Sequence, residues 1–221
     1  MGTVGISGIG KTMLAKELFN SKRSDYDRSC FLFDVRENEN RMSLNNLQSK
    51  LIKDLKDRDI KIERWEEGVE ILKKNLSACE ALIILNDVGH VDQLDPFLPI
   101  KHVLHPKSLI LVTFRVKHIL RSAGIAKSSI YQLPGLNIAH SQELFCLHAF
   151  FQPYPLPRFE NLVDGFLKAC HGLPLSLKVF GSLVCGHDKL YWEEKLNGLH
   201  QILPTEIERS LKISYDSLNH E

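Results

Sequence analysis

The stretch Gly5-Ile6-Ser7-Gly8-Ile9-Gly10-Lys11-Thr12 decides the fold of this 221-residue chain. It follows the pattern G-x-x-x-x-G-K-[ST], in which glycines let the backbone wrap around phosphates and point N–H donors inward. A helix that starts at Gly10 adds the positive end of its dipole. Lys11 can reach the β- and γ-phosphates of a nucleotide, and the Thr12 hydroxyl can coordinate Mg²⁺. The alternative is a glycine-rich turn, but the β-like run Thr3-Val4 before the loop and a helical pattern after it favour a phosphate site.

The composition is ordinary for a soluble globular protein, with 43% hydrophobic and 25% charged residues. A formal charge of +1 gives no bulk field that would draw the chain to nucleic acid or a membrane. The five cysteines form no C-x-x-C pair, which argues against a zinc site or disulfide framework and fits a reducing compartment. No apolar run approaches the roughly 18–20 residues that span a bilayer, and no signal peptide is visible. We expect a cytoplasmic or nucleocytoplasmic protein.

Short apolar runs alternate with helical patterns in the first part of the chain. Strands are predicted at 1–4, 29–35, 81–86, 108–113 and 130–133. Two of them, 81–86 and 108–113, are apolar enough to be buried on both faces of a parallel sheet. Between the strands, one helical pattern follows a possible cap at Ser43 and another runs from Trp65 to Leu76. The alternation predicts an α/β fold, a P-loop NTPase parallel sheet flanked by helices.

From residue 135 onward the patterns are helical. Asn137 can cap a helix that runs through Phe150, and further helical patterns cover 159–170, 175–185, 190–200 and 205–213. We predict an α/β domain at 1–134, an all-helical unit at 135–203 and the start of a further, truncated unit at 204–221. The strand before the loop is short, and an apolar pattern from Leu211 stops at Glu221. We interpret the chain as a piece of a longer protein.

Two strand ends carry candidate chemistry, because ligands of such sheets bind at the carboxyl ends of the strands. The metal-binding carboxylate of a nucleotide site is expected at the end of a strand beside the loop strand. Asn86 holds that position here and Asp87 follows it, so Asp87 is the candidate metal ligand and catalytic residue, or else merely starts a turn. Arg115 ends the next predicted strand. It could read a γ-phosphate through charge-assisted hydrogen bonds, or it could be a solvated surface arginine.

Seven segments carry motifs in a fixed order along the chain. They are Gly5–Thr12, Ser29–Glu37, Leu82–Val88, Val112–Arg115, Gly135–Phe150, Gly172–Leu175 and Leu211–Leu218. Together they resemble the NB-ARC nucleotide-binding region of plant disease-resistance proteins, which are STAND P-loop NTPases. The chain is most similar to the class with an N-terminal TIR domain and C-terminal leucine-rich repeats. So many motifs in the same order leave little room for coincidence.

The resemblance implies a molecular switch that holds ADP at rest and ATP when active, and that self-associates as a full-length protein. It implies that residues 135–203 are the helical ARC subdomain, and that TIR and repeat regions lie outside this chain. The implied cofactors are ADP or ATP with Mg²⁺, and Thr12 and Asp87 would serve the metal. Arg115 would contact the γ-phosphate and Pro174 the adenine. The implied nucleotide-binding set is Gly5, Gly8, Gly10, Lys11, Thr12, Met13, Arg115 and Pro174.

Departures from the family pattern suggest slow or impaired hydrolysis. Asn86 replaces the first of two aspartates, and an amide brings no charge to hold a divalent ion. Met13 and Phe114 replace threonines, without removing a phosphate ligand outright. Two other interpretations stay open at this point. One is a housekeeping P-loop ATPase with continuous turnover, against which Asn86 and the helical unit argue, and the other is a non-functional relative.

Overall fold

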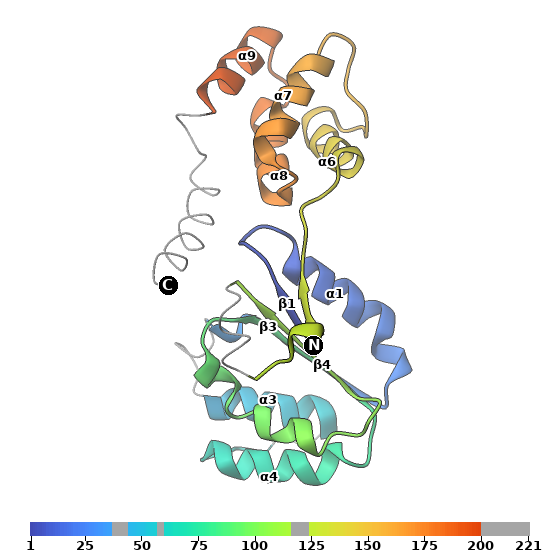
Figure 1. Ribbon diagram of the computed structural model, residues 1–221, viewed down its shortest axis with the longest axis vertical. Helices are drawn as coiled ribbons and strands as arrows, with labels where there is room; N and C mark the ends of the chain where they lie inside the picture. Colours follow the sequence, from blue (N-terminus) through green and yellow to red (C-terminus); the bar gives the residue numbers. More distant parts are fainter. Residues whose placement is uncertain (37–43, 57–59, 116–123, 200–221) are drawn as a thin grey trace. The chain divides into compact units, whose positions relative to one another are not determined.

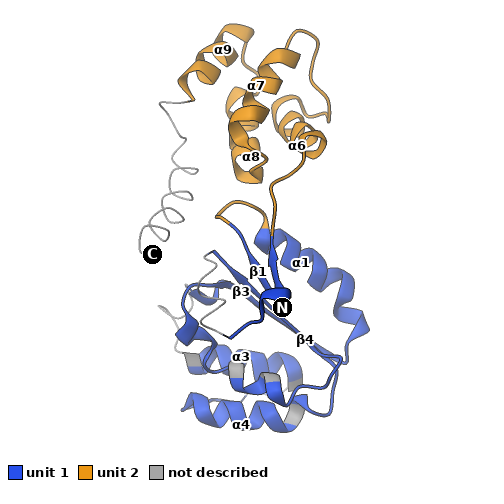
Figure 2. Cartoon of the chain, in the orientation of Figure 1, with its two compact units in different colours: residues 1–5, 11–132 blue, residues 6–10, 133–221 orange. Residues whose placement is uncertain are grey.

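The computed structural model describes residues 1–36, 44–56, 60–115 and 124–199. The chain forms two compact units, coloured separately in Figure 2. The first unit holds Met1–Gly5 and Lys11–Gln132, and the second holds Ile6–Gly10 and Leu133–Glu221. The loop residues 6–10 therefore group with the second unit. The functional divisions 1–134, 135–203 and 204–221 stay predictions, and the last of them falls outside the described residues.

A parallel sheet of five strands forms the first unit (Figure 1). Its strands are β1 (Gly2–Val4), β2 (Arg28–Leu32), β3 (Ala81–Val88), β4 (Leu109–Phe114) and β5 (Ile130–Gln132). The order is β2-β3-β4-β1-β5, and every pairing is parallel. The predicted strands and fold class are confirmed. One expectation is wrong: β3 does not lie beside the loop strand, because β1 bonds to β4 on one side and β5 on the other.

Both faces of the sheet are covered, which explains the continuous apolar runs. Successive strand residues point to opposite faces, so a strand covered on both sides needs apolar residues throughout. In β3, six consecutive residues from Ala81 are buried. Helix α1 (Lys11–Lys22) packs Ala15 against Leu82, Ile84 and Leu111 on one face. On the other face, α3 (Leu44–Lys56) and α4 (Trp65–Leu76) pack in a core with the odd-numbered β3 residues.

The second unit is helical, as predicted, and is built around one tryptophan. Its helices are α6 (Ile138–Phe150), α7 (Glu160–Cys170), α8 (Pro174–Val184) and α9 (Lys189–Gly198). Asn137 caps α6 as expected, with its Oδ1 accepting from the His140 N–H at 2.9 Å. Trp192 is 1% exposed, and its ring packs against four phenylalanines of the unit. The predicted cap Ser43 and helix 205–213 lie outside the described residues.

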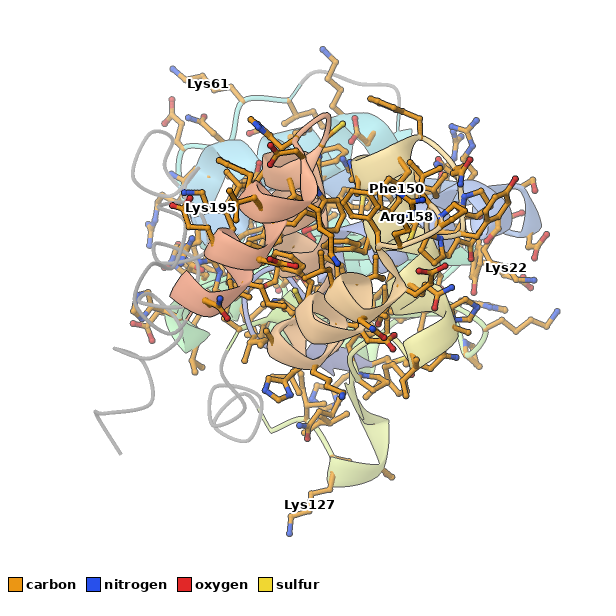
Figure 3. All side chains as sticks on the ribbon, turned by 90° about the horizontal axis from the view of Figure 1, so that it is seen from above. Lys22, Lys61, Lys127, Phe150, Arg158 and Lys195 are labelled. Atoms are coloured by element: carbon orange, nitrogen blue, oxygen red, sulfur yellow. The ribbon has the colours of Figure 1, made fainter. Side chains whose placement is uncertain are left out.

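Short 3₁₀ turns connect the longer elements. The turns are Arg23–Asp25, Val91–Leu94, Leu98–His102 and Lys127–Ser129. In Figure 3, the side chains of Lys22, Lys61 and Lys127 point away from the first unit.

Among the residues described, no helix has the length and apolar character needed to cross a membrane. All five cysteines are free thiols.

Candidate functional site

The glycine-rich loop adopts a conformation that only glycine takes easily. Gly8 has φ +79° and Gly10 has φ +100°, both in the left-handed region that disfavours side chains. Gly8 also lies close to α8: its carbonyl accepts from the Leu175 N–H at 3.3 Å, and a Cβ at Gly8 would come within 2.7 Å of the Leu175 Cβ. Alternating left-handed glycines turn backbone N–H groups toward one side, which is how a loop cradles phosphate.

Lys11 opens α1 in the first unit and is only 8% exposed. Its Nζ donates to the Gly5 carbonyl at 2.7 Å. The pKa of Lys11 is lowered to about 8: burial is the largest cause, the Arg115 and Arg36 charges act in the same direction, and Asp87 opposes them. An anion beside this ammonium would raise the pKa again. The side chain is therefore suited to hold a phosphate group.

The neighbours of Lys11 differ in accessibility. Thr12 is half-buried in the first turn of α1, and its predicted role toward Mg²⁺ stays a prediction. Met13 is 69% exposed, so its side chain faces solvent and its contribution to a nucleotide site would come through the backbone.

Asn86 ends the buried run of β3 on the face that α1 covers, in line with Leu82 and Ile84. Its side chain is fully buried. The Thr113 Oγ1 accepts from the Asp87 N–H at 2.9 Å and donates its single proton to the Asn86 Oδ1 at 3.1 Å. This bond orients the amide, and its Nδ2 has no hydrogen-bond partner among the described residues. Asn86 thus offers buried N–H donors where the family has a carboxylate.

Asp87 lies between two arginines. Its backbone is left-handed, with φ 58°. Arg115 makes a fork: Nε donates to Oδ1 at 3.0 Å and Nη2 donates to Oδ2 at 3.1 Å. Arg36 Nη2 lies 3.3 Å from the same Oδ2. The three side chains are 15%, 20% and 26% exposed for Asp87, Arg115 and Arg36, so the cluster is shielded from water on most sides.

These donors suit a phosphate better than a tightly held Mg²⁺. Mg²⁺ usually takes one or two carboxylates together with phosphates and water. The Thr12 hydroxyl is neutral, the Asn86 oxygen already accepts from Thr113, and both Asp87 oxygens contact arginines. Within the described ranges, no group of three or more histidines, cysteines or acids could hold a metal ion. The residues present do not fit a strong magnesium site.

The Gly172-Leu173-Pro174-Leu175 segment opens α8 in the second unit. Gly172 has φ +71° and its carbonyl accepts from the Leu136 N–H at 2.8 Å. A Cβ there would collide with the Leu136 carbonyl, so glycine is required. Pro174 is half-buried at the first position of the helix, where its missing N–H costs nothing. Its predicted contact with adenine stays a prediction.

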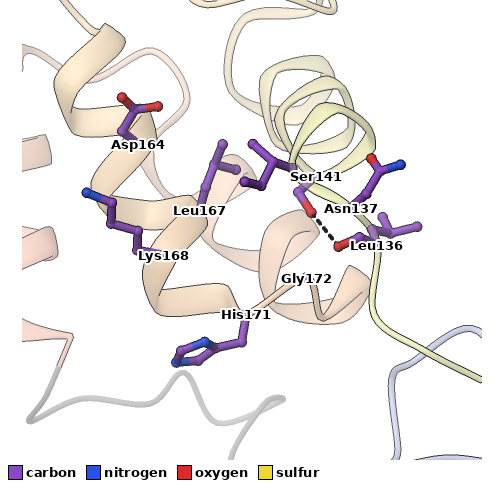
Figure 4. A pocket seen from close by; sticks show the side chains of 9 residues that line it. Leu136, Asn137, Ser141, Asp164, Leu167, Lys168, His171 and Gly172 are labelled. Atoms are coloured by element: carbon purple, nitrogen blue, oxygen red, sulfur yellow. Dashed lines mark hydrogen bonds between the residues drawn. The ribbon is translucent and has the colours of Figure 1, made fainter.

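A cavity of about 640 Å³ lies near this segment (Figure 4). Figure 4 shows the Ser141 hydroxyl donating to the Leu136 carbonyl, a bond of 3.3 Å. None of the predicted nucleotide-binding residues lines the cavity. Its walls are Leu136, Asn137, Ile138, Ser141, Asp164, Leu167, Lys168, His171 and Gly172.

One residue of the charged cluster was missed by the sequence reasoning. Arg36 entered only as part of the 29–37 motif, without a role. The sequence feature that could have indicated Arg36 is its position shortly after the end of β2. Asp87 near the end of β3 and Arg115 after β4 lie at the same carboxyl edge of the sheet. The neighbouring strand order, which decides that these ends meet, is not visible in the sequence.

Comparison with known proteins identifies the family to which this arrangement belongs. The model of the NB-ARC domain matches residues 1–154. The chain belongs to the NB-ARC family. This confirms the resemblance on which the sequence analysis relied.

Plant disease-resistance proteins are among the relatives. The chain is 37% identical over 222 residues to disease resistance-like protein DSC1 of Arabidopsis thaliana, covering 100% of this chain and 18% of that protein. It is 34% identical to disease resistance protein RPV1 of Vitis rotundifolia, covering 99% and 16%. It is 32% identical to TMV resistance protein N of Nicotiana glutinosa, covering 99% and 19%. This NB-ARC chain therefore spans less than a fifth of the length of these relatives.

Two solved structures share the fold. One is a chain of Drosophila ORC bound to DNA, with a TM-score of 0.55 at 16% identity, covering 100% of this chain and 61% of that one. The other is C. elegans PCH-2, with a TM-score of 0.52 at 13% identity, covering 90% and 60%. At such identities the likeness concerns the fold alone.

Proposed function

We propose that this NB-ARC chain is the nucleotide-binding module of a plant immune switch, which holds ADP at rest and exchanges it for ATP. The observation that carries the proposal is the left-handed glycine loop leading into a buried Lys11 whose pKa is lowered to about 8. Burial disfavours the charged form of this lysine, and a bound phosphate would favour that form again. Family membership and the disease-resistance relatives support the same role.

Within this proposal, the loop and Lys11 hold the phosphates, and the Thr12 hydroxyl adds a polar contact. Arg115 contacts the γ-phosphate and Pro174 packs against adenine. The full-length protein self-associates, carries TIR and leucine-rich-repeat regions beyond this chain, and acts in the cytoplasm or nucleocytoplasm. These roles follow from the family resemblance and from the position of each residue in the motifs.

We further infer slow hydrolysis. The strand-end position that should supply charge for a divalent ion is the neutral Asn86, and the next carboxylate, Asp87, is held by two arginines. Phosphoryl transfer relies on stabilising the charge of the phosphates and on positioning water. With little protein charge to hold Mg²⁺, ADP binding should depend weakly on the metal and turnover should be very low.

Calorimetric titration with ADP and ATP, in EDTA and then in Mg²⁺, tests the binding proposal. Lys11→Ala should abolish nucleotide binding without unfolding the chain, whereas the control Lys22→Ala, from the exposed end of the same helix, should bind as the parent does. Retained ADP affinity in Lys11→Ala would show that the loop is not the site.

A turnover assay over a Mg²⁺ titration tests the hydrolysis proposal. Asn86→Asp should strengthen Mg²⁺-dependent ATP binding and raise turnover. A parent rate of about 1 per second or more would instead indicate the housekeeping ATPase. An Asn86→Asp variant indistinguishable from the parent would contradict the role given to Asn86.

A further inference from the structure

We propose that Asp87 is an internal stand-in for the third phosphate of ATP, and that Arg36 joins Arg115 in reading that phosphate. This inference rests on the proposed nucleotide function. It adds Arg36 as a second arginine that contacts the γ-phosphate, and Asp87 as a carboxylate that competes with the γ-phosphate for both arginines. When ADP is bound, Asp87 remains paired with both Arg36 and Arg115. When ATP is bound, its γ-phosphate takes their hydrogen bonds from the carboxylate. Asp87 thereby favours ADP over ATP.

The strand order brings the three residues together. Arg36 follows β2, Asp87 lies near the end of β3 and Arg115 follows β4, and these strands are consecutive neighbours in the sheet. Parallel strands end at the same edge, so the acid of the middle strand lies between an arginine on each side. That edge is also where ligands of parallel α/β sheets bind. The cluster is therefore at the place where a nucleotide phosphate is expected.

The cluster is held in a fixed arrangement before any ligand binds. The Asp87 N–H donates to the Thr113 Oγ1 at 2.9 Å, and the Gly89 N–H donates to the Gln93 Oε1 at 2.7 Å. The stem of Arg36 lies against Gly89, where an added Cβ would come within 2.6 Å of the Arg36 Cγ and Cδ. Side chains that are already positioned lose less entropy when they bind a ligand.

The charges of the cluster call for a further anion. In the part of the chain that the structure describes, Arg36 and Arg115 bring two formal positive charges to the single negative charge of Asp87, which leaves one positive charge in excess in these ion pairs. A terminal phosphate offers three oxygens to the planar guanidinium groups, whereas the carboxylate offers two. ADP lacks that group, and two partly buried arginines without an anion would be unfavourable. The carboxylate fills that role when the γ-phosphate is missing.

The test is a comparison of ADP with β,γ-imido ATP, titrated into the 221-residue chain in EDTA. Asp87→Asn should increase the ratio of ATP affinity to ADP affinity by about tenfold or more, because each arginine loses its competing partner. Arg36→Ala and Arg115→Ala should each decrease that ratio by about tenfold. Arg64→Ala is the matched control and should leave the ratio unchanged. The Arg64 side chain is 79% exposed, and its ion pair with Glu66 is long, with 3.8 Å between Nε and Oε2.

Gly89→Ala is a second probe that alters no charge. Its methyl group would displace Arg36, so it should decrease the ATP preference in the same direction as Arg36→Ala. Melting temperatures identify variants that do not fold; for Arg36, the variant Arg36→Gln then replaces the alanine.

The outcomes separate the proposals. A parent that binds neither nucleotide contradicts the proposed function and this inference with it. A parent that binds both, with the ratio unchanged or lowered in Asp87→Asn, contradicts the inference alone. Equal losses of ADP and ATP in Arg36→Ala would make Arg36 a structural residue and would also overturn the inference.

Discussion

Raising the pH above 8 should weaken ADP binding, because Lys11 then loses the charge that phosphate requires. Lys11 is 8% exposed, and its pKa in the free protein is lowered to about 8, with burial as the largest cause. Arg115 and Arg36 act in the same direction and Asp87 opposes them. A bound diphosphate favours the ammonium, so the pKa of Lys11 in the complex should be well above 8. Binding above pH 8 must then take up a proton.

The structure sets the size of the effect. With a free pKa of about 8, the neutral fraction of Lys11 is about 0.1 at pH 7, about 0.5 at pH 8 and about 0.9 at pH 9. Proton uptake per bound ADP should follow the same series. The affinity should change little below pH 8 and fall about tenfold per pH unit above it, until the pKa of the complex is reached.

Calorimetry in two buffers with different ionisation enthalpies measures this uptake directly. EDTA removes metal ions from the comparison, and Lys22→Ala serves as a control that should keep the same pH profile. Uptake near zero at pH 9, or an ADP affinity that is flat from about pH 7 to about pH 9, would refute the reasoning. Lys11 would then be either permanently charged in the free protein or absent from the phosphate site.

Two further predictions concern the helical unit. Trp192→Ala should destabilise this unit by about 3–5 kcal/mol, because the indole is 1% exposed among four phenylalanines. Trp192→Phe should destabilise it less. Thermal melts followed by circular dichroism measure both variants, and an unchanged melting temperature would contradict the packing. Burial raises the pKa of the Cys170 thiol to about 12 and that of the Cys146 thiol to about 11. Alkylation at pH 8 should therefore label the half-exposed Cys185 before these two cysteines. Equal labelling of the three, measured by mass spectrometry, would argue against a closed core.

Local patterns in the sequence were enough for the elements of the fold. A strand buried on both faces has to be apolar throughout, so β3 and β4 were recognisable from 81–86 and 108–113 alone. The Asn137 cap and the glycine loop are likewise properties of a few consecutive residues. The family was recognisable for the same reason, because its motifs are short and occur in a fixed order.

The candidate site was predictable only in part. Lys11 and Thr12 were identified because their spacing from the glycines carries the chemistry. Asn86 was identified as a departure, but its bond to Thr113 and its unpartnered Nδ2 emerge only when β3 and β4 pair. The role of Arg36 escaped notice, since nothing in its own segment points to an acid 51 positions further along the chain.

By itself, then, the sequence determined the phosphate loop, the strands, the helices and the family of this NB-ARC chain, because each depends on neighbouring residues and their periodicity. Only the tertiary structure decided that β4 lies between β1 and β3, and that the ends of β2, β3 and β4 bring Arg36, Asp87 and Arg115 into one cluster. The lowered pKa of Lys11 also belongs to the folded state, since burial and distant charges produce it. Strand order and charge clusters are set by contacts between residues far apart in the chain, and no local pattern encodes them.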